Sequence, residues 1–300
     1  MKRSILLPAI LLSSLVLASC RQATHLPHYD HIVVVIEENH GYDNVIGSSN
    51  ADFLNKLAKE GALFSDSHGV THPSQPNYLA LFSGSTQGIT DDKCLEAETP
   101  YATDNLAASL ISHGFSFKGF AQTMPNAGYT PCEFEDSKVT DGVLYARKHC
   151  PWVNWQGTGD NAIPASVSQP MSAFPKDFSV LPTVSFVVPD QDYDMHNIGG
   201  PGDAAAIQRG DAWLKDNLAA YAQWAKSHNS LLIVTFDEDD FRPVNHIATI
   251  FAGAHVVPGQ YDQQINHYNV LHTLQEIYDL PGTRATANAE VISAIWNKKG

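Results

Sequence analysis

Basic residues are scarce in this chain. Its 300 residues include 18 Lys and Arg against 32 Asp and Glu, which gives a net charge of -14. A protein that binds the nucleic-acid backbone needs a basic surface, so nucleic acid is not the expected partner. An acidic protein can still bind a phosphorylated molecule if a metal ion supplies the positive charge. The composition therefore makes carboxylate clusters the features to look for.

Three common catalytic signatures are also missing. The sequence contains no G-x-S-x-G nucleophile elbow, no G-x-x-x-x-G-K-[ST] phosphate loop and no H-E-x-x-H zinc helix. Each motif places specific groups around a nucleophile, a nucleotide or a metal. Their absence argues against an esterase of the elbow type, a nucleotide-driven motor and a zinc protease.

The N-terminus has the features of an export signal. Residues 1–20 combine two cations, an apolar run too short for a comfortable membrane span, and small residues at the end. The ending from Leu17 to Cys20 resembles a bacterial lipobox, in which Cys20 is acylated; a plain secretory signal is the alternative. We expect an exported protein in the periplasm or at the cell surface, anchored to the membrane through Cys20 or secreted if the lipobox is not used. Residues 21–29 would form a tether.

Cysteines are few, and three remain after Cys20. An oxidising compartment favours one disulfide, and three pairings are possible. The pair Cys94–Cys132 is preferred because both residues lie in polar, turn-like stretches. Cys150 precedes a proline in a basic and aromatic stretch and is expected to be the unpaired thiol.

Alternating hydrophobic patterns predict an α/β sandwich with a mostly parallel central sheet flanked by helices. Continuous apolar runs typical of buried parallel strands occupy 31–36, 183–188, 231–236 and 247–252. Helical periodicity occurs at 52–60, 105–113, 204–226 and 267–278. We expect a single domain over 30–300, with the Pro-, Gly- and aromatic-rich segment 91–179 forming cap-like excursions outside the sheet core.

Two acidic pairs follow predicted strands. Glu38-Asn39 comes after the first strand and Asp237-Glu238 after a later one. Ligands collect beyond the carboxyl ends of strands in open parallel sheets, and oxygen ligands suit a hard divalent cation. Either pair alone could equally be solvated or cap the next helix. Together they predict one metal site.

Ser74 precedes Pro76 and an apolar helical stretch, which places it at a helix N-terminus where backbone N–H groups attract phosphate. Taken alone, Ser74 would more readily be an N-cap. Its proximity to the acidic pairs, if they converge, would make it a nucleophile that also contacts the metal. His196 and His267 are further candidates, because imidazoles at such positions can ligate a metal or transfer protons. Asp194, two residues before His196, is a candidate with them.

Six segments, in order, resemble the phosphoesterase family of bacterial acid phosphatases and phospholipases C, within the alkaline-phosphatase-like superfamily. They include IVVVIEENHGYDNVIGS, THPSQPNYLALFSGST, PDQDYDMH and FDEDD. The resemblance implies that Ser74 is the nucleophile. It also implies that the metal is bound by Glu38, Asn39, Asp237 and Glu238. The residues that it places in the phosphate pocket are Asp194, His196 and His267. Two-metal relatives carry Asp-His where this chain has Asp237-Glu238. One divalent ion is therefore expected, with Ca, Mg or Mn favoured over Zn by the all-oxygen ligands.

The resulting prediction is a metal-dependent acid phosphatase that hydrolyses phosphate monoesters through a phosphoserine on Ser74. Asn77 or nearby N–H groups would hold the phosphate oxygens, and His196 or His267 would protonate the leaving alcohol. A phosphoinositide or a nucleotide is a possible substrate. The alternatives are a phospholipase C-like phosphodiesterase and, in another class, a lipoprotein that binds phosphate compounds without turnover.

Overall fold

The computed structural model describes residues 26–95, 99–140 and 142–297. The predicted signal peptide, the lipobox Cys20 and most of the tether lie outside these residues. No helix within the described ranges is both long and apolar enough to cross a membrane.

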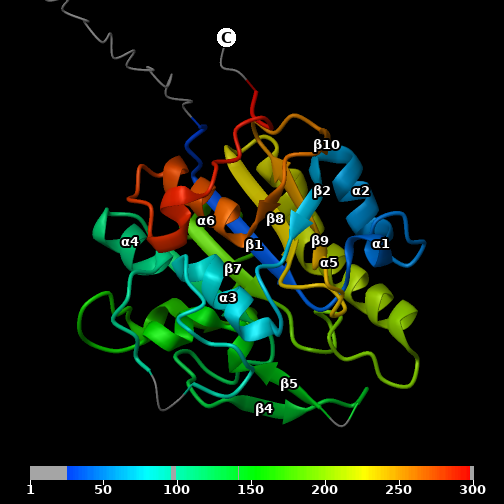
Figure 1. The fold of residues 1–300 in the computed structure, drawn as a ribbon, viewed down its shortest axis with the longest axis horizontal. Coiled ribbons are helices and arrows are strands. Elements are labelled where there is room, and N and C mark those ends of the chain that lie inside the picture. The colour runs from blue at the N-terminus through cyan, green and yellow to red at the C-terminus, as the bar shows by residue number, and fades with distance from the viewer. Residues whose placement is uncertain (1–25, 96–98, 141, 298–300) are drawn as a thin grey trace, which may run out of the picture.

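A nine-stranded sheet forms the centre of the molecule, in the order β10-β2-β9-β8-β1-β7-β3-β6, with β11 pairing to β2 (Figure 1). A separate hairpin joins β4 to β5. The strands are β1 His31–Glu37, β2 Ala62–His68, β3 Phe117–Ala121, β4 Glu133–Asp136, β5 Val143–Ala146, β6 Ser168–Pro170, β7 Val184–Val188, β8 Ser230–Phe236, β9 His246–Gly253, β10 Gly259–Tyr261 and β11 Ile265–Asn266.

Parallel pairing brings most carboxyl ends of the strands to one edge. β1 pairs in parallel with β7 and β8, and β3 pairs in parallel with β7 and β6. β9 is antiparallel to both β8 and β2, so β2 has the same direction as β1. The segments that follow β1, β2, β7 and β8 therefore all leave the sheet at the same edge.

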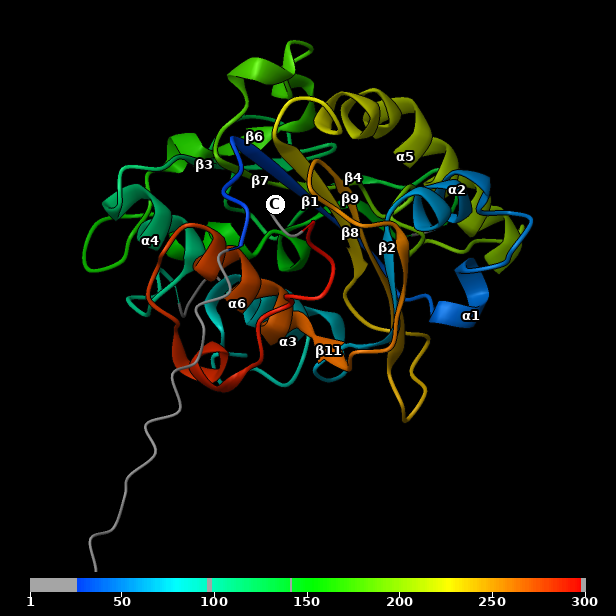
Figure 2. The ribbon, with the colours of Figure 1, turned by 90° about the horizontal axis from the view of Figure 1, so that it is seen from above.

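Helices cover both faces of the sheet (Figure 2). α3 and α6 contact each other on one face, and α2 and α5 contact each other on the other. The helices are α1 Tyr42–Val45, α2 Asp52–Glu60, α3 Ser74–Ser83, α4 Leu106–Ser112, α5 Asp203–Ala225 and α6 His267–Ile277, with 3-10 turns η1 Arg147–His149, η2 Pro151–Trp155, η3 Ala165–Val167, η4 Met171–Ala173, η5 Phe178–Val180 and η6 Arg284–Asn288.

The central strand β1 shows why its sequence is continuously apolar. Ile32 and Val34 pack in the core on the α3 and α6 side, whereas Val33 and Val35 pack in the core on the α2 and α5 side. All four are fully buried. A strand with helices on both faces has no polar side to solvate, so alternation is lost.

The predicted α/β class and mostly parallel sheet are confirmed, and the four predicted strands and four predicted helices all form. The prediction that 91–179 stays outside the sheet core is wrong in part, because β3 lies inside the sheet between β7 and β6. The sequence FKGFA is short, and its Lys118 is exposed. Gly119 leaves room for Trp152, since a Cβ there would lie 2.1 Å from the indole.

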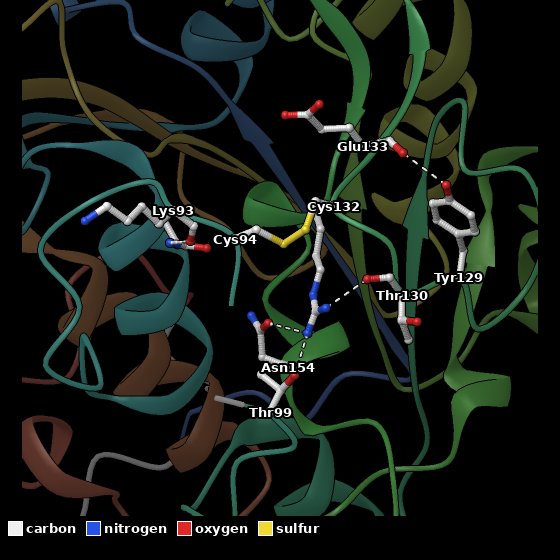
Figure 3. Close-up of a disulfide and its surroundings, with 10 residues drawn as sticks. Lys93, Cys94, Thr99, Tyr129, Thr130, Cys132, Glu133 and Asn154 are labelled. Carbon is white, nitrogen blue, oxygen red and sulfur yellow. Dashed lines mark hydrogen bonds between the residues drawn. A yellow bond between two sulfur atoms is a disulfide. The ribbon is translucent and has the colours of Figure 1, made fainter. Parts of the chain in front are cut away.

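The predicted disulfide joins Cys94 to Cys132, and Cys150 is a buried free thiol. Figure 3 shows the bridge between the loop that contains Lys93 and the chain entering β4 at Glu133. Segment 91–179 is thus cross-linked internally by a disulfide, and it contributes β3 and β6 to the sheet.

Candidate active site

Hydrogen bonds join the ends of three parallel strands. The backbone N–H of Glu38, after β1, donates to the carbonyl of Asp194, after β7, at 2.8 Å, and the N–H of Asp237, after β8, donates to Glu37 at 3.0 Å. Asn39 and Met195 have φ values of 52° and 79°, a left-handed conformation that side chains rarely adopt. Such strain persists where the surrounding structure enforces it.

Ser74 reaches this edge from β2. The loop after His68 leads directly into α3, whose first residue is Ser74. Asn77 shapes that loop: its Oδ1 accepts from the N–H groups of Val70 and Thr71 at 2.8 and 3.0 Å, and its Nδ2 donates to Thr71 and Pro73. Both amide hydrogens of Asn77 are therefore used within the loop that leads to Ser74.

The Ser74 hydroxyl faces two carboxylates. Its Oγ lies 2.9 Å from Oε1 of Glu238 and 3.2 Å from Oε2 of Glu38, and the side chain is buried. The oxygen of the Asn39 amide faces the same two carboxylates; with its nitrogen turned to them, it would donate at 3.1 and 2.9 Å. Four predicted residues therefore meet at one point, drawn from β1, β8 and α3.

Asp237 lies at the edge of this group. Its Oδ1 accepts from the backbone N–H of Glu238 at 2.6 Å and of Asn39 at 3.3 Å. Its Oδ2 is buried and has no hydrogen-bond partner among the described residues. A buried carboxylate oxygen left without a partner is costly, which makes it a natural ligand for a cation.

The cluster carries more negative charge than burial readily permits. Burial, and then the nearby charges of Glu38 and Glu238, raise the pKa of Asp237 well above its usual range. Burial and Glu38 raise the pKa of Glu238 to about 7. Like charges this close cannot all stay ionised without compensation, and a divalent cation would supply it.

His149 is a site residue that the sequence did not reveal. It lies in η1, buried, with Nε2 2.8 Å from Oε1 of Glu38 and Nδ1 3.3 Å from Oδ2 of Asp194. Although burial lowers the pKa of His149, the Glu38 and Asp194 carboxylates raise it to about 9. The imidazolium in turn outweighs burial at Glu38 and holds the pKa of that carboxyl below its usual range. The only available signal was the run Arg147-Lys148-His149 in an acidic chain.

The two predicted histidines occupy different environments. His267 is buried, with Nε2 2.6 Å from the carbonyl oxygen of Asp237, and burial lowers its pKa to about 4. A neutral ring that donates to this carbonyl supports the strand end, and it does not match the expected imidazolium donor. His196 is partly exposed and lies beside His149, with ring centroids 5.8 Å apart. Its backbone N–H donates to Oδ1 of Asp194 at 2.9 Å.

His72 contacts the Glu238 carboxylate, whereas His149 contacts that of Glu38. Nδ1 of His72 pairs with Oε2 of Glu238, and the His72 ring stacks on Phe241 at 4.9 Å between centroids. Phe241 is 63% exposed and has a φ of 62°, which is unusual for a bulky residue. This segment therefore covers the His72 and Glu238 pair in a strained conformation.

A divalent cation fits this chemistry, although it requires small side-chain movements. Within the described ranges, no three His, Cys, Asp or Glu side chains already surround one point in a metal-binding arrangement. The oxygens that could hold a cation come from Glu38, Asn39, Glu238 and Ser74, with Oδ2 of Asp237 adjacent. An all-oxygen set of this kind suits a hard cation.

Comparisons with known proteins agree with this architecture. Residues 48–281 match the model of the phosphoesterase family. The chain is 47% identical to a phosphatidylinositol-3-phosphatase of Mycobacterium tuberculosis, over 91% of this chain and 85% of that protein. It is 26% identical to a probable acid phosphatase of Kluyveromyces lactis, over 90% of this chain and 63% of the yeast protein, so it spans less than two thirds of that relative.

Solved structures show the same fold at low identity. A protein of the alkaline phosphatase superfamily from Vibrio parahaemolyticus aligns with a TM-score of 0.59 and 14% identity, over 90% of this chain and 72% of that one. A phosphonate monoester hydrolase from Silicibacter pomeroyi aligns with a TM-score of 0.55 and 9% identity, over 88% and 76%. Given the family match over most of its length and the 47% identity above, the chain belongs to the phosphoesterase family.

Proposed function

We propose that this protein is a metal-dependent phosphatase that hydrolyses phosphate monoesters with Ser74 as its nucleophile. One observation carries the proposal. Ser74 is the first residue of α3, and its hydroxyl oxygen lies within 3.2 Å of both the Glu38 and the Glu238 carboxylates. A serine that only caps a helix needs no such carboxylate pair, whereas a nucleophilic hydroxyl is activated by an adjacent base or by a metal ion that such carboxylates can hold.

Glu38, Asn39, Glu238 and the Ser74 oxygen would hold one divalent cation, with Asp237 completing the set. The cation would lower the pKa of the Ser74 hydroxyl and neutralise charge on the phosphate oxygens. Calcium, magnesium or manganese is favoured over zinc, because no nitrogen or sulfur ligand is needed.

The reaction would proceed in two displacements on phosphorus. Oγ of Ser74 forms a bond to phosphorus as the bond to the leaving alcohol breaks, which gives a phosphoserine. His149 places positive charge beside the site, and the more exposed His196 can protonate the departing alkoxide. Water then attacks phosphorus from the vacated side as the bond from phosphorus to Oγ of Ser74 breaks, which releases phosphate, and a proton from the water restores the Ser74 hydroxyl. His267 and Asn77 act by holding Asp237 and the Ser74 loop.

Relatives named phosphatidylinositol-3-phosphatase and acid phosphatase support a small phosphorylated substrate, with a phosphoinositide among the candidates. Export and attachment to the membrane through Cys20 remain part of the proposal. They depend on the pattern in residues 1–20. A lipid-anchored enzyme outside the cytoplasm would meet phosphate esters at a membrane surface.

The test compares 4-nitrophenyl phosphate with bis(4-nitrophenyl) phosphate, before and after removal of metal by a chelator. We expect faster turnover of the monoester, loss with chelator, and recovery with one added cation. Ser74→Ala should abolish turnover while thermal melting stays unchanged. Ser83→Ala removes another buried hydroxyl from α3 and should keep activity.

Three results would contradict the proposal. Turnover retained by Ser74→Ala would remove the nucleophile. Preference for the diester would indicate a phosphodiesterase. Tight binding of a phosphate ester by the metal-loaded protein without any phosphate release would indicate a binding protein.

A further inference from the structure

A cavity of about 490 Å³ opens beside the nucleophile. Its walls include Gln75, the residue after Ser74, together with His196 and the Cys94–Cys132 disulfide. This volume lies in the range of small-molecule sites. A phosphate ester whose phosphorus meets Ser74 must place its alcohol portion outside the carboxylate cluster. The adjoining cavity offers that space, lined partly by the proposed proton donor.

Lys148 supplies a positive charge to this cavity. Its Nζ lies 2.8 Å from Oδ2 of Asp92, and Oδ1 of Asp92 accepts from the backbone N–H of Gln75 at 2.9 Å. One carboxylate therefore separates the ammonium from the first turn of α3. The Lys148 side chain is 19% exposed, so it is largely fixed and still borders the cavity.

The environment keeps Lys148 charged. Burial alone lowers the pKa of the ammonium, but Glu38 and Asp92 have the larger combined effect and raise it. Arg147 also borders the cavity, yet its guanidinium donates to the carbonyl of Thr130 and to Thr99 and Asn154. Figure 3 shows these three acceptors gathered below the disulfide. Glu133, the other acid of the lining, is exposed.

The loop that carries Asp92 is held in place from two sides. Nε2 of Gln75 donates to the carbonyls of Asp91 and Lys93 at 3.0 and 2.8 Å. Two residues further on, Cys94 is bonded to Cys132, whose carbonyl accepts from the backbone N–H of Arg147 at 2.8 Å. Both partners of the Lys148–Asp92 pair are thus fixed before a ligand arrives, which favours recognition of one charge position.

We propose that this cavity holds the leaving alcohol of the substrate, and that Lys148 selects alcohols that carry a second anionic phosphate. The inference rests on the proposed function, since it assigns substrate class to the same site. The ammonium gains a partner in the second phosphate while the transferred phosphoryl group stays at Ser74. A polyol ring bearing two phosphate groups matches this requirement. Lys148 is a specificity residue, not a nucleophile or proton donor.

The experiment compares inositol 1,3-bisphosphate with inositol 3-phosphate, two substrates that share one ring and differ by the second phosphate. Wild-type enzyme should show about tenfold higher kcat/KM for the bisphosphate, the size expected for one charge-assisted contact. Lys148→Met should remove this preference through KM for the bisphosphate. Its kcat/KM for the monophosphate should stay within about twofold of wild type. Lys148→Arg keeps the charge and should keep most of the preference.

Lys93→Met is the matched control. Lys93 lies on the same loop and pairs with Asp91, but it is 85% exposed and does not line the cavity. This variant should keep the preference. The inference is overturned if wild type shows no preference, or if Lys148→Met lowers kcat/KM equally for both substrates, as a purely structural ion pair would. Failure to release phosphate from either substrate with any added cation would instead reject the proposed function.

Discussion

The edge of the sheet and segment 91–179 contribute to the site in different ways. The sheet edge supplies the carboxylates, which follow the buried strands β1 and β8, and Ser74, which begins α3; backbone hydrogen bonds join the ends of β1, β7 and β8. Segment 91–179 supplies His149 and Lys148 on irregular turns, fixed by one disulfide and by two strands of the sheet, β3 and β6. Chemistry is expected to depend on the first region and substrate choice on the second.

The largest expected effect separates the two regions most clearly. Glu238→Gln removes one of the two carboxylates at the Ser74 hydroxyl, so kcat for 4-nitrophenyl phosphate should fall by about 10²–10³-fold. Cation affinity, measured by calorimetry, should fall with it. Melting temperature should hold or rise, because the variant has one buried charge fewer. Glu60→Gln changes an exposed carboxylate and should alter neither. Equal activity in both variants would contradict the view that the chemistry depends on the carboxylates at the sheet edge.

Removal of the disulfide should have the opposite result to Glu238→Gln: stability should fall and turnover should remain. Replacing Cys94 and Cys132 with Ser opens a link between residues 38 positions apart, and the free energy of unfolding should fall by about 2–4 kcal/mol. Denaturant titration measures this change. Well below the melting temperature, 4-nitrophenyl phosphate turnover should stay within a few-fold of wild type. Cys150→Ala, which removes the free buried thiol, is the control. A loss of turnover as large as that of Glu238→Gln would place the disulfide in the chemistry.

His149 belongs to segment 91–179 and contacts Glu38 at the sheet edge. Its raised pKa predicts that the stability of the fold depends on pH, with a smaller effect than the changes above. Its pKa is raised to about 9 in the folded protein, so its stabilising contribution is complete below the unfolded value near 6.5 and disappears as pH rises through 9. In chelator-treated protein, stability should fall by about 1–3 kcal/mol between pH 7 and pH 9.5.

Two histidine variants test whether His149 causes this pH dependence. His149→Gln should flatten the fall in stability, measured as melting temperature across the pH series. His113→Gln removes an exposed ring and should leave the fall unchanged. A wild-type protein that gains stability over this range would contradict a charged, buried His149.

Much of the sheet edge was predictable because its signals are local. A continuous apolar run such as HIVVVI predicts a buried strand, and residues after it must lie at the sheet edge. That reasoning predicts that Glu38, Asn39, Glu238 and Ser74 lie together. The pair Glu38-Asn39 follows from its place at the strand end, and the resemblance implies the same two residues. In the structure, burial raises the pKa of Glu37 well above its usual range, on the opposite side of the strand.

Segment 91–179 was harder because its roles depend on tertiary contacts. His149 meets Glu38 only because η1 packs against α3, and no spacing in the sequence records that contact. β3 was missed because a five-residue strand with an exposed Lys118 and a central glycine lacks a clear period. The hydrogen bonds of Asn77 and His267 could not be predicted for a similar reason: their partners are backbone carbonyls that only the folded chain brings close.

The central claim is that Ser74 becomes phosphorylated during turnover. The direct measurement is acid quenching of the metal-loaded enzyme during hydrolysis of a phosphate monoester, followed by mass spectrometry of the peptide that contains Ser74. We predict one added phosphoryl group on Ser74, absent when substrate is omitted and absent in Ser74→Ala. Rapid turnover with the peptide unmodified at every quench time, or with the phosphoryl group on another residue, would contradict the account.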